Sequence, residues 1–404
     1  MNDASLLLEA VKSQSKWIAA TLRDLVEIES PSDNKPAVDA AVRHVAALAT
    51  ALGGRVKLHR QKNFGDVLAV SFNVARFGPA RNRLKPILLL GHLDTVWPLG
   101  TLREMPWREC KGRDGTRVFG PGILDMKAGI VMALASVRAL TQLGIHRPIT
   151  LLLNSDEEVG SPISRPITER LALASQAVLV LEPAQGLACK TSRKGVGLYR
   201  LQVTGVAAHS GVDFARGHSA ILELARLLQT VAGFTDPRLG RTVNPGVISG
   251  GSRANVVAEH AFAEVDVRIT RASDAARVDR LFHRLRCADP ACKLQVVGGL
   301  TRPPMERKPA TAALYKQARK LASSLGFQLD EAASGGGSDG NFTAALGVPT
   351  LDGLGAVGEG AHAAHESILL DPLFPRTALL AALLISYGTS PSLQSPPTAP
   401  VGKV

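Results

Sequence analysis

Short aliphatic runs alternate with helical stretches through the first half of the chain, and this alternation limits the fold more than any other feature. The runs are VLAVSFNV, PILLLG, ITLLLN and AVLVLEP, and apolar residues recur at helical spacing over 4–28, 36–53 and 127–143. Continuous aliphatic strands separated by helices are typical of a largely parallel sheet with both faces covered. The pattern predicts an α/β domain with a mostly parallel sheet covered by helices.

The pattern changes near Arg193. GLYRLQVTG, NPGVISGG and AFAEVDVRIT alternate apolar and polar residues, as half-exposed antiparallel strands do. We therefore expect a smaller α+β insertion at 194–302, between a first catalytic part at 1–193 and a second at 303–388. Residues 389–404 are rich in Pro and Ser and are predicted to form a disordered tail.

Length and composition argue against several classes of function. A chain of 404 residues is long enough for two domains. The formal charge is +12, but the sequence has no dense basic runs with interleaved aromatics of the kind that nucleic-acid binding uses. We therefore expect a generally basic surface and no nucleic-acid partner. The four cysteines have no CxxC spacing, and no apolar run reaches membrane-spanning length. We expect reduced thiols, no membrane partner and a cytoplasmic location.

Acidic and imidazole side chains follow the buried strands, where ligands bind in open α/β sheets. They are His92, Asp94, Asp156, Glu157, Glu158, Glu182, His362 and His365, with Asp125 in the Gly/Pro turn FGPGILDMKAG. Each alone is typical of a helix cap or a solvated side chain. Together, crowded carboxylates are costly unless some are protonated or a cation neutralises them. Imidazole and carboxylate ligands suit zinc, and five ligand residues with one shared carboxylate suit two ions about 3.5–4 Å apart.

Eight motifs, in order along residues 15–388, resemble the zinc-dependent exopeptidase and deacylase family. That family includes glutamate carboxypeptidase, aminoacylase, acetylornithine deacetylase and succinyl-diaminopimelate desuccinylase, and the chain is most similar to its glutamate carboxypeptidase members. The motifs are GHLDTVWP, GPGILDMKAG, NSDEEVGS, LEP, GVAAHSG, NVVAEHAFAEVDVR, GGGSDGNF and GAHAAHE. The resemblance implies the zinc-exopeptidase fold, with the insertion acting as a lid and as a homodimerisation domain.

The resemblance also implies a metal-ligand set. It assigns His92 and Glu182 to one zinc ion and Glu158 and His362 to the other, with Asp125 bridging both. Cobalt or manganese would fit similar ligands. The last motif, HAAHE, contains a second histidine, His365, but His362 has the expected offset of four before a glutamate.

Three further residues receive catalytic roles from the resemblance. Asp94 orients the imidazole of His92, and Glu157 is the general base that deprotonates a water shared by the two zinc ions. His209 of GVAAHSG donates to the tetrahedral oxyanion. Because His209 lies in the insertion, we expect it to reach into the partner's active site in a homodimer.

Recognition of a small substrate through its free carboxylate is assigned to the lid. Asn255 and Arg268 match the family's lid residues, and Ser338 of the GGGSDG loop could contact the same carboxylate. One departure is AEH, which follows NVV where a Pro-containing segment is often found.

The sequence thus predicts a dinuclear zinc amidohydrolase that releases a C-terminal amino acid, glutamate among the candidates, from N-acyl or peptidyl substrates. An N-acyl-amino-acid deacylase or a dipeptidase with the same mechanism remains an alternative. A catalytically silent metal-binding scaffold is the alternative of a different class, and the presence of Glu157 argues against it.

Overall fold

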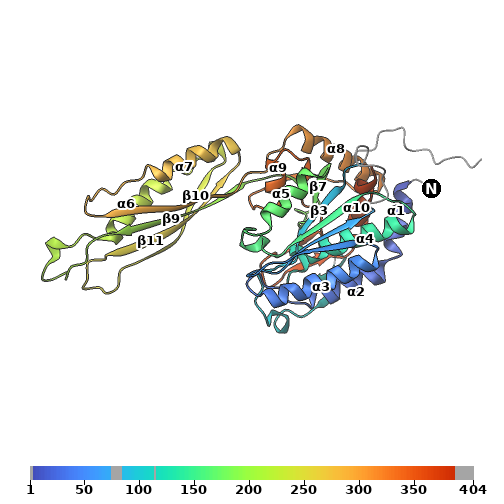
Figure 1. Cartoon of the computed structure of the whole chain (residues 1–404), viewed down its shortest axis with the longest axis horizontal. Helices are drawn as coiled ribbons and strands as arrows, with labels where there is room; N and C mark the ends of the chain where they lie inside the picture. The colour runs from blue at the N-terminus through green and yellow to red at the C-terminus, as the bar shows by residue number, and fades with distance from the viewer. Residues whose placement is uncertain (1–2, 74–83, 113–114, 387–404) are drawn as a thin grey trace, which may run out of the picture. The chain divides into compact units, whose positions relative to one another are not determined.

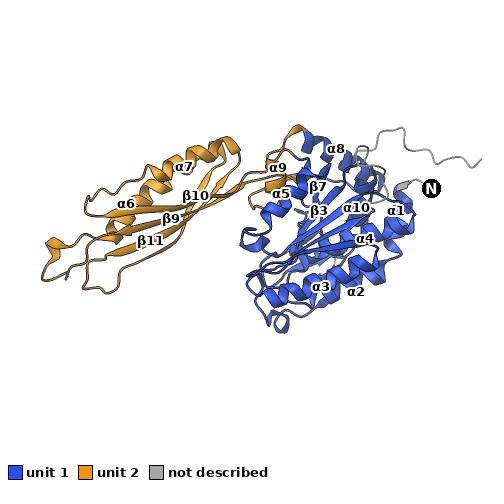
Figure 2. Cartoon of the chain, in the orientation of Figure 1, with its two compact units in different colours: residues 1–189, 310–331, 348–404 blue, residues 190–309, 332–347 orange. Residues whose placement is uncertain are grey.

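The computed structural model describes residues 3–73, 84–112 and 115–386, and the chain divides into two compact units. Figure 2 colours unit 1, residues 1–189, 310–331 and 348–404, and unit 2, residues 190–309 and 332–347. The C-terminal segment 389–404, predicted to be a disordered tail, lies outside the described residues.

A six-stranded sheet forms the centre of unit 1 (Figure 1). Its strands, in spatial order, are β1 (Arg55–His59), β2 (Val67–Phe72), β6 (Ile149–Asn154), β3 (Ile87–His92), β7 (Ala177–Val180) and β14 (Thr350–Leu351). The last four run parallel, as predicted. The sheet is nevertheless mixed, because β1 and β2 form a hairpin, and β2 lies antiparallel to β6.

Helices cover both faces of this sheet. The helices that pack within unit 1 are α1 (Asp3–Lys12), α2 (Ser15–Val26), α3 (Lys35–Ala51), α4 (Ala128–Gln142), α5 (Arg165–Leu173), α8 (Pro309–Ser324) and α10 (Leu373–Ser386). Alternate residues of β3 enter different cores: Leu89 joins the larger cluster and Leu88 the smaller one on the opposite face. Among the helices that the structure describes, none has both the length and the apolarity to span a bilayer.

The single helix expected over 4–28 is two helices. Ser13 donates its hydroxyl hydrogen to the carbonyl of Ala10 at 2.8 Å, and the buried Gln14 donates to the same carbonyl at 3.0 Å. Such local side-chain bonds compete with the helical ladder, and α1 ends where they form. The break was not predicted, because the apolar spacing in the sequence continues across it.

A second sheet of unit 1 was not predicted. It contains β15 (Gly358–Glu359), β16 (Ser367–Leu369), β5 (Gly115–Phe119) and β4 (Arg108–Gly112), in that order. Its strands are short, and most residues of β4 and β5 are not fully buried, so they lack the aliphatic runs on which the prediction depended. Its neighbouring strands are antiparallel.

Unit 2 is an antiparallel α+β unit. Its four-stranded sheet has the order β10 (Thr242–Gly250), β11 (His260–Ile269), β9 (Gly195–Thr204) and β12 (Lys293–Arg302). The unit also contains the helices α6 (Ala220–Ala232), α7 (Ala275–His283) and α9 (Gly340–Ala345), and all but the first residue of each strand in the pair β8 (Cys189–Arg193) and β13 (Glu331–Ser334). Alternate residues of β9 and β11 pack with α6 and α7 in one core, which includes Tyr199 stacked on Phe282.

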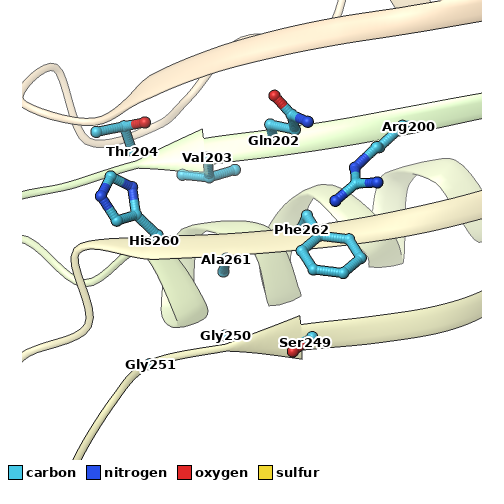
Figure 3. Close-up of a pocket in the computed structure, with 10 residues that line it drawn as sticks. All are labelled: Arg200, Gln202, Val203, Thr204, Ser249, Gly250, Gly251, His260, Ala261 and Phe262. Atoms are coloured by element: carbon cyan, nitrogen blue, oxygen red, sulfur yellow. The ribbon is translucent and has the colours of Figure 1, made fainter.

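The opposite face of this sheet has a hollow of about 320 Å³ (Figure 3). There the guanidinium carbon of Arg200 lies 4.0 Å from the ring centre of Phe262, and Arg200 pairs with Glu264 at 3.3 Å. None of the site residues predicted from the sequence lines this hollow.

The register of the central sheet brings the predicted site segments to one edge. His92, the last residue of β3, lies opposite Asn154 of β6, and Leu90 lies opposite Val180 of β7. The parallel strands therefore end at nearly the same level. Asp156–Glu158 follow β6 and Glu182 follows β7, so both segments emerge beside His92.

Candidate metal centre

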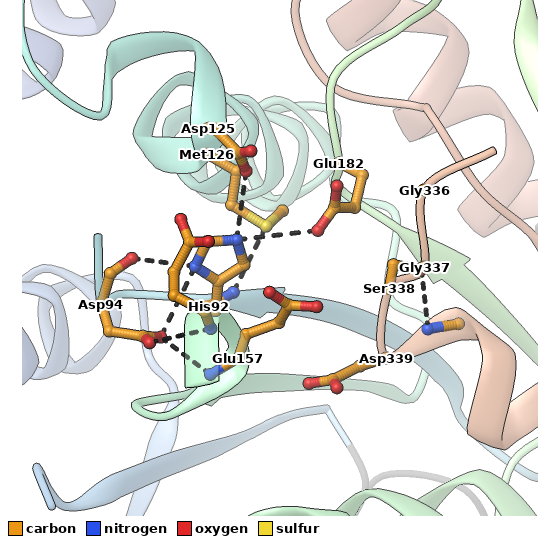
Figure 4. Close-up of polar contacts among 12 residues, drawn as sticks. His92, Asp94, Asp125, Met126, Glu157, Glu182, Gly336, Gly337, Ser338 and Asp339 are labelled. Atoms are coloured by element: carbon orange, nitrogen blue, oxygen red, sulfur yellow. Dashed lines mark hydrogen bonds and ion pairs between the residues drawn. The ribbon is translucent and has the colours of Figure 1, made fainter. Parts of the chain in front are cut away.

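His92 is the buried anchor of one group of potential ligands. Its Nδ1 lies 2.9 Å from the backbone oxygen of Asp94, and its Nε2 lies 3.2 Å from Oδ1 of Asp125 and 3.6 Å from Oε1 of Glu182 (Figure 4). A carbonyl oxygen can only accept, so Nδ1 carries the hydrogen and Nε2 is directed at the two carboxylates. One ligand atom from each of His92, Asp125 and Glu182 lies within 4.8 Å of the other two.

A second group shares Asp125. Nε2 of His362 lies 3.4 Å from Oδ2 of Asp125 and 3.3 Å from Oε2 of Glu158, and these three residues also offer ligand atoms within 4.8 Å of one another. Asp125 thus directs one oxygen at each histidine. His365 belongs to neither group among the described residues and is exposed.

His362 has a left-handed backbone conformation, with φ of 61°. Residues other than glycine rarely adopt this conformation, and it costs energy that the surrounding structure must offset. Such strain is often found where a side chain has to be aimed at a functional site.

The surroundings of the two imidazoles favour positive charge at this site. Bonds to Asp125 and Glu158 raise the pKa of His362 to about 10, although burial opposes the shift. Burial alone would lower the pKa of His92, but bonds with Asp125, Asp94 and Glu182 raise it well above its ordinary value. Burial opposes a low pKa for Asp125 as well, yet the two imidazoles hold that pKa well below its usual range.

The donor set fits metal ions. Oε1 of Glu158 is buried and has no hydrogen-bond partner among the described residues, which is costly unless a cation contacts it. Imidazole nitrogens with carboxylate oxygens are ligands for zinc, and a carboxylate with one oxygen toward each group can bridge two ions. The residues present therefore can hold two ions.

Asp94 organises the loop that follows β6. Its carboxylate accepts from the backbone N–H of Glu157 at 3.2 Å, that of Glu158 at 3.1 Å, and the hydroxyl of Ser32 at 2.7 Å. The same carboxylate lies 3.5 Å from Nδ1 of His92, farther than the backbone oxygen of Asp94. Asp94 therefore contacts His92 mainly through its main chain. Figure 4 shows Glu157 beside this pair.

Four of the predicted residues lie in unit 2, and His209 and Asn255 are adjacent there. The N–H of Gly211 donates to Nδ1 of His209 at 3.1 Å, so Nδ1 accepts and the hydrogen of a neutral ring is on Nε2. Residue 209 is bridged to Val256, and the N–H of Ser210 donates to the oxygen of Asn255. The side chains of His209 and Asn255 are exposed.

Arg268 and Ser338 already have partners. The guanidinium of Arg268 forms a two-pronged contact with Asp266, Nε to Oδ1 at 2.9 Å and Nη2 to Oδ2 at 2.9 Å. Ser338 is fully buried, and its hydroxyl oxygen accepts from the N–H of Gly340 at 3.1 Å. Asp266 and Arg268 lie two positions apart on β11, and this pairing was not predicted from the sequence.

Several residues around the metal centre were not singled out from the sequence. Glu366 is buried and accepts four hydrogen bonds from the segments that carry Asp125 and Trp97. Lys127 is buried and donates to the oxygen of Ile28, and burial lowers the pKa of Lys127 to about 8. Arg376 is buried and donates to the carbonyls of Gly353 and Gly355.

Arg376 supports Glu182 indirectly. Arg376 donates to the backbone oxygen of Gly355, and the N–H of Gly355 donates to the backbone oxygen of Glu182 at 2.9 Å. Most acceptors of Arg376 are backbone carbonyls, which leave no pattern in the sequence, so this role could not have been read from composition or spacing.

The fold and the paired imidazole–carboxylate groups define a metal-dependent hydrolase. Residues 88–386 match the family described as Peptidase family M20/M25/M40. The chain belongs to this family. That finding confirms the resemblance inferred from the motifs.

Individual relatives agree with the family match. The chain is 29% identical over 389 residues to carboxypeptidase G2 of Pseudomonas sp. (strain RS-16), covering 94% of this chain and 91% of the relative. It is 28% identical to acetylornithine deacetylase of Myxococcus xanthus, covering 67% and 71%.

Solved structures share the fold at low identity. A tripeptidase from Staphylococcus aureus superposes with a TM-score of 0.74 at 20% identity, covering 92% of this chain and 97% of that one. A metallo-carboxypeptidase of the same family from Sulfolobus solfataricus gives 0.68 at 16% identity, covering 91% and 98%.

Proposed function

We propose that this chain is a dinuclear zinc hydrolase that cleaves an amide bond and releases a C-terminal amino acid from an N-acyl or peptidyl substrate. The proposal depends on the observation that the two carboxylate oxygens of Asp125 face different histidines. Oδ1 lies 3.2 Å from Nε2 of His92, and Oδ2 lies 3.4 Å from Nε2 of His362. A bridging carboxylate between two histidine–glutamate pairs is suited to two-metal hydrolysis. The similarity to carboxypeptidase G2 supports release of a C-terminal residue.

In this proposal His92 and Glu182 would hold one ion, Glu158 and His362 would hold the other, and Asp125, which belongs to both ligand groups, would be shared. The ions would supply Lewis acidity to the substrate carbonyl and lower the pKa of a water. Zinc fits this mixture of nitrogen and oxygen ligands, and cobalt or manganese would fit similar ligands.

Glu157 acts as the general base. Its carboxylate takes a proton from the attacking water and then gives that proton to the leaving amine nitrogen. The backbone bond from Glu157 to Asp94 supports this role, because it fixes the base relative to the residue that orients His92. Asp94 thus aligns an imidazole ligand and the base together.

His209 donates from Nε2 to the oxygen on which charge develops. The bond from the N–H of Gly211 to Nδ1 supports this role, because it favours the tautomer with a hydrogen on Nε2.

The free carboxylate of the substrate is bound by Arg268 and Asn255, with Ser338 as a further contact. The planar guanidinium of Arg268 is suited to two-pronged recognition of a carboxylate. Because Asp266 already occupies that guanidinium, the substrate has to share or displace this contact.

Unit 2 acts as the lid and as the homodimerisation domain. Its functional boundaries lie near Arg193, where the strand pattern changes from buried to alternating, and near Arg302, where helices and buried strands return. In the homodimer, His209 of one subunit would complete the active site of its partner.

A hydrolysis screen tests the proposal. Purified protein loaded with zinc is assayed against peptidyl amino acids, N-acyl amino acids and dipeptides, each with a free and an amidated C-terminus. Release of a C-terminal amino acid from peptidyl substrates supports a carboxypeptidase. Preference for short acyl groups, as the similarity to acetylornithine deacetylase would allow, indicates a deacylase, and preference for free dipeptides indicates a dipeptidase.

Glu157→Gln distinguishes an enzyme from a silent scaffold. The variant should lose about 10²–10⁴-fold in kcat, since the general base is gone, while zinc content measured by elemental analysis stays at the wild-type value. Glu169→Gln, at a glutamate paired with Arg165 on α5 of the same unit, is the matched control and should keep full activity. Zinc binding without turnover of any substrate by the wild type would favour the scaffold.

A further inference from the structure

Glu366 is a buried carboxylate whose two oxygens are both fully engaged. Oε1 accepts from the N–H of Leu124 at 2.9 Å and from that of Asp125 at 3.0 Å. Oε2 accepts from the N–H of Gly122 at 2.8 Å and from the indole N–H of Trp97 at 2.7 Å. The residue has no exposed surface.

These four bonds join three segments that carry proposed metal ligands. Glu366 follows His362 by four residues, Trp97 follows His92 by five, and the remaining donors belong to the turn that contains Asp125. The Glu366 carboxylate therefore connects the turn that carries Asp125 with the segments that carry both histidines.

The turn that contains Asp125 departs from helical geometry. Asp125 and Met126 have non-helical backbone angles, φ −114° and ψ 91°, and φ −136° and ψ 37°. The N–H groups of residues 122, 124 and 125 therefore need acceptors from elsewhere, because an unpaired buried N–H is costly. Glu366 supplies an acceptor for each of the three.

Gly122 shows how closely this turn is packed. Its φ is 70°, and a Cβ at this position would lie 2.6 Å from Cγ2 of Thr95. Only glycine fits both restrictions, and its N–H is one of the donors to Glu366.

We propose that Glu366 is a positioning residue of the metal centre, which holds Asp125 between the two ligand groups so that each of its oxygens meets one ion. The inference rests on the proposed dinuclear site. The Glu366 carboxylate contacts Asp125 at its backbone N–H, and Glu366 belongs to neither ligand group. Residues that orient metal ligands in this way typically contribute about 10–100-fold to metal affinity.

Glu366→Gln tests the role while keeping size and shape. The amide of glutamine has one acceptor oxygen, and its NH₂ group would face backbone donors that cannot accept. We measure zinc dissociation constants of the purified full-length chain by competition with a chromophoric chelator, and the melting temperature of the zinc-free protein. The expected result is a loss of zinc affinity of about 10–100-fold.

Two variants separate positioning from general stability. Glu223→Gln changes another buried glutamate that accepts backbone N–H groups, those of Ala288 at 2.6 Å and Asp289 at 3.2 Å, in unit 2. It should lower the melting temperature and leave zinc affinity unchanged. Trp97→Phe removes a single donor to Glu366 and should weaken zinc binding less than Glu366→Gln does, which keeps the test usable if that variant does not fold.

The outcomes distinguish the inference from the function on which it rests. Weaker zinc binding in Glu366→Gln or Trp97→Phe, with unchanged binding in Glu223→Gln, supports the positioning role. Wild-type zinc affinity in the folded Glu366 and Trp97 variants, with only a lower melting temperature, overturns that role and leaves the dinuclear site intact. A wild-type protein that binds no zinc overturns both.

Discussion

Asp94 contacts other residues at the metal centre through both its backbone and its side chain. Its backbone oxygen accepts from His92, and its carboxylate accepts from the N–H groups of Glu157 and Glu158. The sequence predicted that Asp94 orients the imidazole, but not which of its atoms would contact His92. Side-chain types and spacing predicted which residues the structure brings together in the two ligand groups, whereas contacts through main-chain atoms depend on backbone geometry that the sequence does not show.

Arg268→Ala should lower kcat/KM chiefly for substrates with a free carboxylate. Loss of a two-pronged guanidinium contact removes a charge-assisted pair, worth about 1.5–3 kcal/mol, or about 10–100-fold. The measurement compares kcat/KM for free and amidated versions of one substrate. Arg200→Ala is the matched control, since Arg200, like Arg268, lies on the sheet of unit 2 and is paired with a carboxylate, that of Glu264. Equal losses on both versions of the substrate would remove the proposed role of Arg268.

At the scale of elements, a carboxylate ties α3 to the hairpin of β1 and β2. Asp66 accepts from Lys35 at 2.9 Å, from Arg60 at 2.6 Å and from the N–H of Gln61 at 2.9 Å. Burial would raise the pKa of Asp66, but these bonds outweigh burial and lower it. The ionised carboxylate therefore stabilises the folded unit.

Asp66→Asn should lower the free energy of unfolding at pH 7 by about 1–3 kcal/mol. Since the folded pKa lies below the unfolded value of about 3.9, the stabilisation is present above the unfolded pKa and is lost as pH falls through the folded pKa. The difference from wild type, measured by urea unfolding, should be constant from pH 7 to about pH 5 and narrow below about pH 4. A difference that widens on acidification would contradict this account.

Elements with a strong apolar pattern were predictable, and elements held by local polar contacts were not. The strands β3 and β6 match the runs PILLLG and ITLLLN, and the alternating pattern of GLYRLQVTG became β9. The second sheet of unit 1 is partly exposed and short, so it left no such signal. The break between α1 and α2 depends on two side-chain bonds rather than on hydrophobic spacing.

At the scale of the whole molecule, the residues with proposed roles are distributed over both compact units. The two ligand groups belong to unit 1, whereas His209 and Arg268 belong to unit 2. The sequence predicted an inserted unit because the strand pattern changes, but pattern alone carries no information on which subunit of a homodimer supplies His209.

Mixing two inactive variants tests whether His209 acts on the partner's site. Glu157→Gln lacks the base, and His209→Ala lacks the oxyanion donor. If His209 acts across a homodimer, unfolding and refolding the two together should restore about a quarter of wild-type activity, because half of the dimers are mixed and each has one complete site. The control is each variant refolded alone. No recovery from a mixture shown to be dimeric would assign His209 to its own subunit.

Anomalous diffraction at the zinc edge, from crystals of the zinc-loaded protein, shows whether two metal ions share Asp125. We expect two anomalous peaks about 3.5–4 Å apart, one beside His92 and Glu182 and the other beside Glu158 and His362, with Asp125 between them. A single peak, or peaks away from these residues in fully loaded protein, would contradict this expectation.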